Sequence, residues 1–205
     1  MKTLVLQCKF VAHSYQGVRL TPDQHEELDW PPSPGRLHQA LMAAALTGVP
    51  PGKEKMLAAK PLDALRWLEH QAPPEIVASA ISDESQSATH FRLAMPQNNP
   101  AKSDPTRTSI LLKPTPPLRA VAPTKEPLKV CYVWRLEDAA SQEAATRHRE
   151  AFAELTAQVR YLGRAEDWIE IELKNDTTNA PSEACLTWRP TNQAVDIDLW
   201  VPRDG

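Results

Sequence analysis

The residues best placed to bind a ligand are Gly35 and Arg36, near the start of a helix predicted over 33–47. Ser33 can cap that helix, and Pro34 suits its first position, where no N–H group is needed. The first turn of a helix has free amides and a partial positive charge, so it favours anions. Gly35 would let a ligand approach the backbone, and the Arg36 guanidinium suits a phosphate. The same residues fit a simpler interpretation, a capped helix with a solvated arginine.

Six histidines raise the question of metal binding or nuclease chemistry. None stands at a metal-ligand spacing such as HExxH, and the acidic residues are dispersed, so we expect no metal site. His13 and Tyr15 follow the first predicted strand, and acid–base catalysis by such a pair would cleave RNA without a metal. His148 falls on the apolar face of a predicted helix, where we expect it to pack. Walker, GxGxxG and GxSxG motifs are absent, and we expect no catalytic residue and no cofactor.

The charge is unevenly distributed along the chain. The 205 residues carry a net charge of −3, which argues against a general nucleic-acid binder. The window 102–135, however, contains seven basic and two acidic residues. Such a stripe on an acidic body suits a subunit that holds one stretch of nucleic acid and meets protein elsewhere. Arg107, Lys113 and Arg119 lie in its proline-rich part, which could follow a strand of RNA.

The composition indicates one ordinary domain with a real core. No apolar run approaches the about 18 residues of a membrane helix, and Gln7 and Lys9 interrupt the N-terminal apolar pattern, which excludes a signal peptide. Cys8, Cys131 and Cys185 are far apart and odd in number, which fits a reducing cytoplasm and neither a zinc site nor a disulfide framework. We expect a cytoplasmic protein with no membrane partner.

The predicted elements follow the order strand, helix, insertion, strand, strand, helix, strand. This order matches the split βαβ pattern of an α+β, ferredoxin-like (RRM-like) core, with extra strands at the C-terminal end. The predicted strands are 3–11 (continuing toward Tyr15), 76–81, 89–95, 109–113, 128–136, 168–173, 184–188 and 195–201; the helices are 33–47, 55–70 and one from Asp138 or Ser141 to a stop at Gly163; polar or mobile loops are expected at 17–29 and 96–108.

The tryptophans are divided between core and surface. Trp67, Trp168 and Trp188 are expected in the core. Trp30, beside two prolines, either packs under that loop or faces a partner, and the sequence does not distinguish these two arrangements.

Three strings stand in order along the chain: Asp29–Leu37 (DWPPSPGRL) ahead of an alanine-rich helix, Tyr132–Trp134 (YVW) and Tyr161–Trp168 (YLGRAEDW). Together they resemble the fused five–six (Csb-type) subunit of type I-U, also called I-G, CRISPR Cascade complexes, a member of the RAMP superfamily. The chain resembles its N-terminal, Cas-five-like half. The resemblance implies a single ferredoxin-like domain over 1–205 with an inserted thumb at about 73–127, and the absence of the C-terminal Cas-six-like half, in which the family's processing activity lies.

By this resemblance the protein would grip the 5′ handle of the CRISPR RNA and cap the backbone filament of the complex. Its partners would be the CRISPR RNA, the backbone subunit, the large subunit and a Cas-six-like domain. The RNA-binding candidates are Arg36, Arg107, Lys113, Arg119, Tyr161 and Arg164. Two other functions stay open: a metal-independent endoribonuclease that processes CRISPR RNA, and a structural adaptor without RNA contact. Arg164 could equally pair with Glu166 or Asp167.

Overall fold

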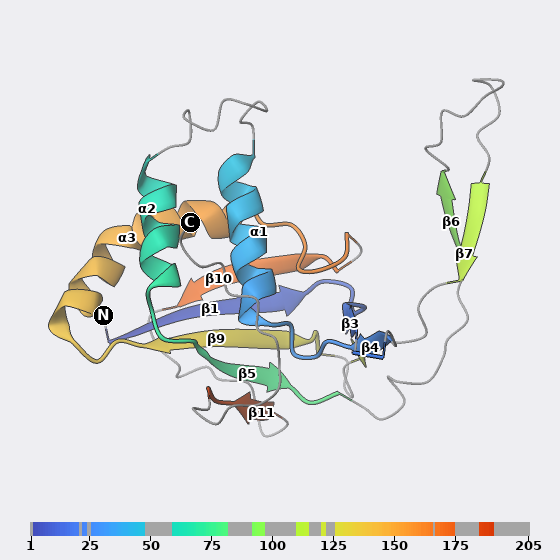
Figure 1. Cartoon of the computed structure of the whole chain (residues 1–205), viewed down its shortest axis with the longest axis horizontal. Coiled ribbons are helices and arrows are strands. Elements are labelled where there is room, and N and C mark those ends of the chain that lie inside the picture. The colour runs from blue at the N-terminus through green and yellow to red at the C-terminus, as the bar shows by residue number, and fades with distance from the viewer. Residues whose placement is uncertain are drawn as a thin grey trace.

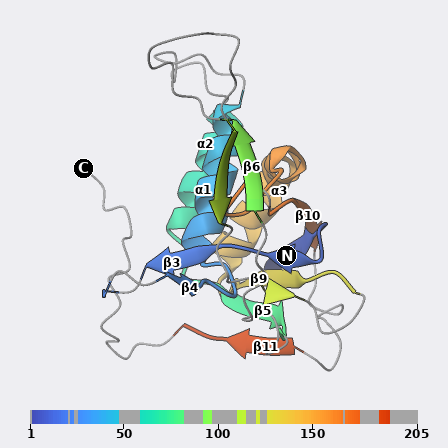
Figure 2. The same cartoon turned by 90° about the vertical axis from the view of Figure 1, so that its right-hand side faces the viewer.

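The computed structural model shows a layer of strands with helices gathered on one of its sides (Figures 1 and 2). No helix among the residues that the structure describes is long and apolar enough to cross a membrane. The structure describes residues 2–20, 22–23, 26–47, 59–81, 92–96, 110–114, 120–121, 126–165, 167–174 and 185–190.

A five-stranded antiparallel sheet forms the centre of the fold, in the order β10-β1-β9-β5-β11. The first strand of the split βαβ pattern is β1, which lies between the fourth (β10) and the third (β9), while the second (β5) lies beside the third. The predicted ferredoxin-like α+β core is therefore confirmed, with β11 added at its edge. The strands are β1 (Thr3–Phe10), β5 (Glu75–Ser79), β9 (Lys129–Arg135), β10 (Ile169–Lys174) and β11 (Cys185–Trp188).

Helices α1 (Pro34–Leu46), α2 (Ala59–Glu69) and α3 (Ala139–Gln158) cover one side of the sheet (Figure 1). Alternate side chains of a strand point to the same face, and Leu4, Leu6 and Phe10 of β1 are fully buried in one apolar cluster with Leu41 and Phe152. Each such burial stabilises the fold by about 1.5–3 kcal/mol relative to an exposed side chain. The three helices therefore pack against the hydrophobic face of the sheet, and all of them lie on that one side.

Helix α1 begins as the sequence predicts. Ser33 is its N-cap, with its hydroxyl accepting the Arg36 N–H at 3.4 Å, and Pro34 occupies the first turn. Thr47 ends the helix. The predicted stop at Gly48 lies outside the described residues.

Helix α3 ends earlier than predicted. Asp138, one of the two expected caps, is its N-cap, but the last helical residue is Gln158, so the predicted stop at Gly163 is wrong. Beyond the helix the N–H of Ile169 donates to the carbonyl of Arg160 at 3.0 Å. The chain thus leaves the helix because its backbone pairs with the segment that enters β10.

The predicted polar loop over 17–29 is wrong. Strands β3 (Val18–Leu20) and β4 (Glu26–Leu28) form an antiparallel pair there. Val18 lies opposite Leu28, and Arg19 Nη2 lies 3.1 Å from Glu27 Oε2 across the pair. Cross-strand pairs of this kind stabilise a hairpin that a mostly polar sequence does not reveal.

The range predicted for the insertion, about 73–127, contains β5, which lies between β9 and β11 in the sheet. Two further strands, β6 (Arg92–Pro96) and β7 (Ile110–Pro114), pair with each other and stand apart from the body (Figure 1). A short pair joins β2 (Ser14–Tyr15) to β8 (Ala120–Val121). The expected mobile loop after Pro96 and the expected strand at 195–201 lie outside the described residues.

The aromatic residues divide between core and surface differently from the prediction. Trp67 and Trp188 pack against the core, as expected, and the ring of His148 lies 5.8 Å from that of Trp67. Trp168 is 62% exposed, so its predicted burial is wrong. Because residues two apart in a strand share a face, Trp168 lies on the side of Glu170, which is also exposed.

Tyr132→Phe is expected to lower the free energy of unfolding by about 1–3 kcal/mol in urea denaturation. The hydroxyl donates to the Pro32 carbonyl at 2.8 Å in buried surroundings, so its removal leaves a buried acceptor without a donor. Tyr15→Phe is the matched control, because Tyr15 is equally buried and its hydroxyl has no hydrogen-bond partner. Its stability should stay the same or rise. A larger loss for Tyr15→Phe than for Tyr132→Phe would contradict the assignment.

Candidate functional site

Residues from the three sequence strings meet at one end of the sheet. The Tyr132 hydroxyl, on β9, holds the Pro32 carbonyl of the first string. The indole N–H of Trp30 donates to the Ser79 carbonyl at 3.0 Å, and its ring lies 5.7 Å from Phe10. Trp30 therefore packs inward beneath its proline-rich loop, which resolves the two arrangements that the sequence left open.

Arg36 is held by partners inside the protein. Its Nε donates to Asp29 Oδ2, and its Nη2 donates to the Val18 carbonyl at 2.6 Å. The side chains of Arg36 and Asp29 are 27% and 15% exposed. These bonds join the start of α1 to β3. The guanidinium thus has a structural role. The predicted contact with an RNA phosphate stays a prediction, and it would have to use the N–H groups that Asp29 and Val18 leave free.

Tyr15 fills the space between these segments. Its ring is fully buried, 5.3 Å from Phe10 and 5.5 Å from Trp30. Gly17 is required beside it, because a Cβ there would lie 1.9 Å from the Tyr15 hydroxyl oxygen, and a Cβ at Gly163 would lie 3.5 Å away. Burial raises the pKa of the Tyr15 phenol well above its usual value. The group is therefore neutral and closed off from solvent.

Residues 160–165 and 167–168, here called the glycine loop, are held by the carboxylate of Asp167, which is 1% exposed. Its Oδ1 accepts the Gln16 N–H at 2.8 Å, and its Oδ2 accepts the Arg164 N–H at 3.2 Å. Gly163, directly before Arg164, has φ at +102°, a conformation that favours glycine. Of the two predicted partners of Arg164, Asp167 binds its backbone N–H, and Glu166 lies outside the described residues.

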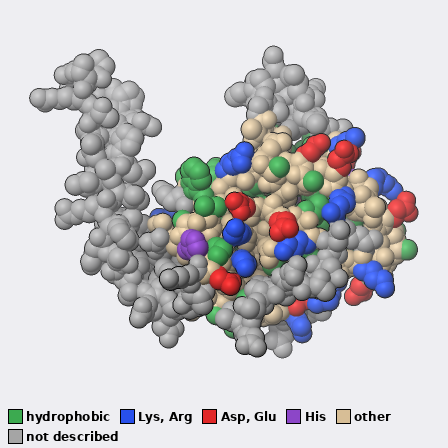
Figure 3. All heavy atoms as spheres, turned by 180° about the vertical axis from the view of Figure 1, so that it is seen from behind, with side chains coloured by type: hydrophobic (Ala, Val, Ile, Leu, Met, Phe, Trp, Pro, Cys, Tyr) green, Lys and Arg blue, Asp and Glu red, His purple; other side chains and the backbone are tan. Residues whose placement is uncertain are grey.

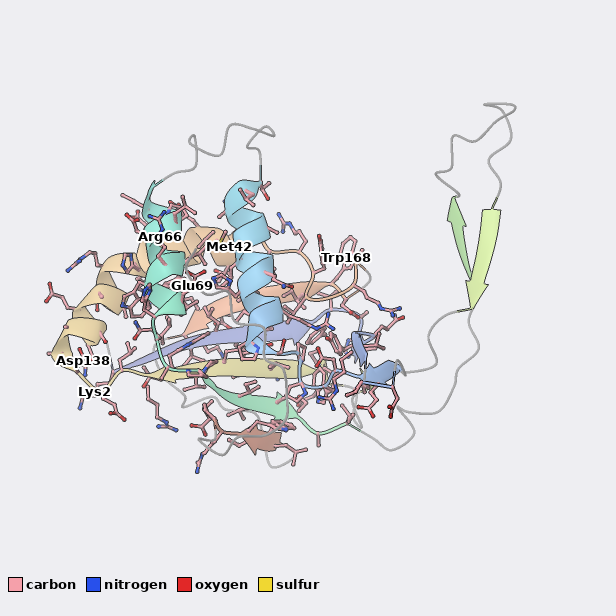
Figure 4. All side chains as sticks on the ribbon, viewed as in Figure 1. Lys2, Met42, Arg66, Glu69, Asp138 and Trp168 are labelled. Carbon is pink, nitrogen blue, oxygen red and sulfur yellow. The ribbon has the colours of Figure 1, made fainter. Side chains whose placement is uncertain are left out.

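The glycine loop also carries two exposed aromatic rings. Tyr161 is 48% exposed, and Trp168 lies opposite it in an antiparallel bridge. Figure 4 places Trp168 at the end of the body nearest to the β6–β7 hairpin. Arg160 and Arg164, exposed and half-exposed, lie in the same loop. Aromatic planes beside arginines are the side-chain types that hold single-stranded nucleic acid.

The structure brings together only part of the predicted RNA-binding set. Tyr161 and Arg164 lie together on the glycine loop, and Arg36 and Arg164 both lie near enough to Tyr15 to lower its pKa, against the larger effect of burial. Lys113 belongs to β7, in the separate hairpin, where the backbone alone is described. Arg107 and Arg119 lie outside the described residues.

Sequence reasoning did not single out Trp168 as a surface residue or Asp167 as the anchor of the loop. The signal for Trp168 was present, since it shares the alternation of Glu170 and Glu172 along its strand. Asp167 had no comparable signal, because its partner at Gln16 is distant in the sequence.

A metal site finds no support in this part of the chain. Across the residues described, no group of three or more histidine, cysteine, aspartate or glutamate side chains could hold a metal ion. His13 is exposed on the turn after β1 with φ at 55°, whereas Tyr15 is buried, so the two side chains face different surroundings. His38 Nε2 lies 3.0 Å from Glu69 Oε1, between α1 and α2.

The fold and the loop define a ferredoxin-like α+β protein with aromatic rings and arginines exposed at one end of its sheet. The chain belongs to the CRISPR-associated protein, GSU0054 family, whose sequence model matches residues 7–205. Membership supports a role in CRISPR defence. No curated protein matches the chain.

Arg36→Ala is expected to lower the free energy of unfolding by about 1.5–3 kcal/mol, the range for hydrogen bonds to charged groups. The change leaves the mostly buried Asp29 carboxylate without its guanidinium partner. Arg66→Ala is the matched control, because that side chain is 70% exposed and 3.6 Å from Asp63, so its removal should cost well under about 1 kcal/mol. Equal stabilities of the two variants in urea would show that Arg36 has no structural role.

Proposed function

We propose that this protein is the CRISPR RNA-binding subunit of a type I-U/I-G Cascade effector complex and that it grips the 5′ handle of that RNA. The observation that carries the proposal is the glycine loop, which carries the exposed Tyr161 and Arg160 and the half-exposed Arg164 at one end of a ferredoxin-like sheet. Membership of a CRISPR-associated family supports the same conclusion.

The glycine loop is suited to binding because its conformation is set before a ligand arrives. Asp167 binds the backbone N–H groups of Gln16 and Arg164, and Gly163 allows the sharp turn directly before Arg164. A loop that is already ordered loses less conformational entropy on binding, so more of the contact energy contributes to affinity. Arg164 adds a planar cation that suits a phosphate.

The partners follow from the resemblance rather than from any described contact. In this proposal the protein caps the filament of backbone subunits, contacts the large subunit and works beside a Cas-six-like domain. The β6–β7 hairpin, which stands apart from the body, takes the place of the thumb.

In this proposal the protein holds RNA and does not cut it. Cleavage at a 2′-hydroxyl requires a base and an acid that converge on one phosphate. The structure favours binding, because the Tyr15 phenol is buried with a raised pKa while His13 lies in solvent.

Arg164→Ala should weaken binding of single-stranded repeat RNA by about 10- to 150-fold, the effect of about 1.5–3 kcal/mol for a charge-assisted bond. The slope of log affinity against log salt should fall by about 0.7, because one phosphate contact is lost. Arg66→Ala, on α2 at the far side of the body (Figure 4), is the control and should bind as the wild type does. Fluorescence anisotropy over a salt series measures both quantities. Unchanged affinity and slope in a folded Arg164→Ala would refute the phosphate contact.

The purified chain should give no cleavage product from repeat RNA after long incubation, with or without EDTA. Processing should appear only when a Cas-six-like domain is added. Denaturing gels of end-labelled RNA provide the measurement. Product that forms in EDTA and disappears with His13→Ala or Tyr15→Phe would instead establish the endoribonuclease function.

A further inference from the structure

The two exposed rings of the glycine loop stand on a short antiparallel ribbon. The Leu162 N–H donates to the Asp167 carbonyl and the Ile169 N–H to the Arg160 carbonyl, both at 3.0 Å. These bonds flank Tyr161 and Trp168, which face each other across the bridge. They therefore form a non-hydrogen-bonded pair, in which Cα atoms lie about 4.5 Å apart and both side chains project from the same face.

The backbone beneath these rings is anchored by hydrogen bonds. The Val11 N–H donates to the Trp168 carbonyl at 2.9 Å, so the turn after β1 holds one strand of the ribbon. Gln16 holds the same strand through the Asp167 Oδ1, and the Asp167 Oδ2 binds the Arg164 N–H in the turn that connects the two strands. The rings therefore stand on an ordered base although their own surfaces lie in solvent.

Neither ring has an aromatic partner within the described part of the chain. The ring contacts there join buried or half-buried residues, such as Phe10, Tyr15 and Trp30, and none involves Tyr161 or Trp168. Val11, beside them, is 50% exposed. In Figure 3 hydrophobic side chains gather on the surface at the end of the body where Figure 4 labels Trp168. Burying apolar surface is favourable, so an exposed tryptophan among other exposed apolar side chains indicates a surface to which a partner binds.

We propose that Tyr161 and Trp168 form a stacking platform for unpaired bases of single-stranded RNA, with Trp168 as its principal residue. This inference rests on the proposed function and adds the mode of binding. The arginines of the loop would bind phosphates of the RNA backbone, and the two rings would stack on the unpaired bases.

The surroundings favour a nucleic-acid base over a protein side chain as the occupant. Arg160 and Arg164 lie in the same loop as the rings, and the described carboxylates next to Trp168 in the chain are already engaged: Asp167 by backbone N–H groups and Glu170 by Lys9 at 3.4 Å. Every base has a π-face, so such a platform tolerates any sequence but requires a base that is not stacked in a duplex.

The test compares Trp168→Ala, Trp168→Phe and Leu186→Ala in the full chain. Leu186 is the matched control, because it is also an exposed hydrophobic residue, 52% exposed, but lies on β11. The probe is a fluorescein-labelled single-stranded RNA of the CRISPR repeat, titrated over a salt series. Trp168→Ala should weaken binding by about 5- to 150-fold, as expected for loss of a stacked base. Trp168→Phe should keep most of the affinity, and Leu186→Ala should keep all of it.

Two further measurements identify stacking itself. The salt slope should not change in Trp168→Ala, since no phosphate contact is lost, whereas Arg164→Ala should lower it. A series of RNAs with one abasic position each should contain a position at which wild type and Trp168→Ala bind equally weakly. A duplex of the same sequence should compete poorly. A double variant with Tyr161→Ala shows whether both rings contact one base, because the two effects would then be non-additive.

Each contrary outcome has a separate meaning. If the wild type binds the RNA and Trp168→Ala binds it equally well, the platform is refuted while the proposed RNA-binding function stands. If the wild type binds no RNA, the proposed function fails and the platform with it. If Trp168→Ala keeps its RNA affinity but no longer joins the neighbouring subunits, the rings form a protein interface and the inference is overturned.

Discussion

The packing of the Tyr15 ring is the contact on which the candidate site depends. The ring is fully buried against Phe10 and Trp30 on one side and lies beside Gly17 and Gly163 on the other. It thus joins the end of the first strand, the proline-rich loop and the glycine loop. Interiors are close-packed, so a change of shape at this ring would be felt in all three segments. Its hydroxyl has no partner, which indicates that shape, not hydrogen bonding, accounts for the ring's position.

The two arginines of the site have different tasks. Arg36 uses its guanidinium on Asp29 and the Val18 carbonyl and so helps to build the scaffold. Arg164 uses its backbone N–H on Asp167, and the residue is only half-exposed. Removing the Arg36 guanidinium would leave the mostly buried Asp29 carboxylate without its partner, whereas the Arg164 guanidinium is the one proposed to bind a phosphate. Both arginines lower the pKa of Tyr15, so the structural arginine and the proposed RNA-binding arginine lie near the same ring.

Much of the fold follows from local patterns. The ferredoxin-like core was predicted from the alternation in β1, the apolar run in β9, the cap at Ser33 and the order of the elements. The structure agrees with this prediction. The errors fall where local propensity competes with pairing to a distant segment. Helix α3 stops at Gln158 because the following backbone pairs beside β10, and β3 pairs with β4 where the residues between them are polar. Such pairings are decided by tertiary contacts, which no window of sequence contains.

Strand alternation and helix capping depend on near neighbours, so the order of residues was enough to predict the class of fold and the position of the first helix. The task of each side chain depended instead on contacts that form when the chain folds. Asp167 binds Gln16, and Arg36 binds Val18, across gaps in the chain that spacing does not bridge. Trp168 is exposed while its neighbour Ile169 is buried in the core, because successive residues of a strand point to opposite faces and only the folded chain decides which face is covered.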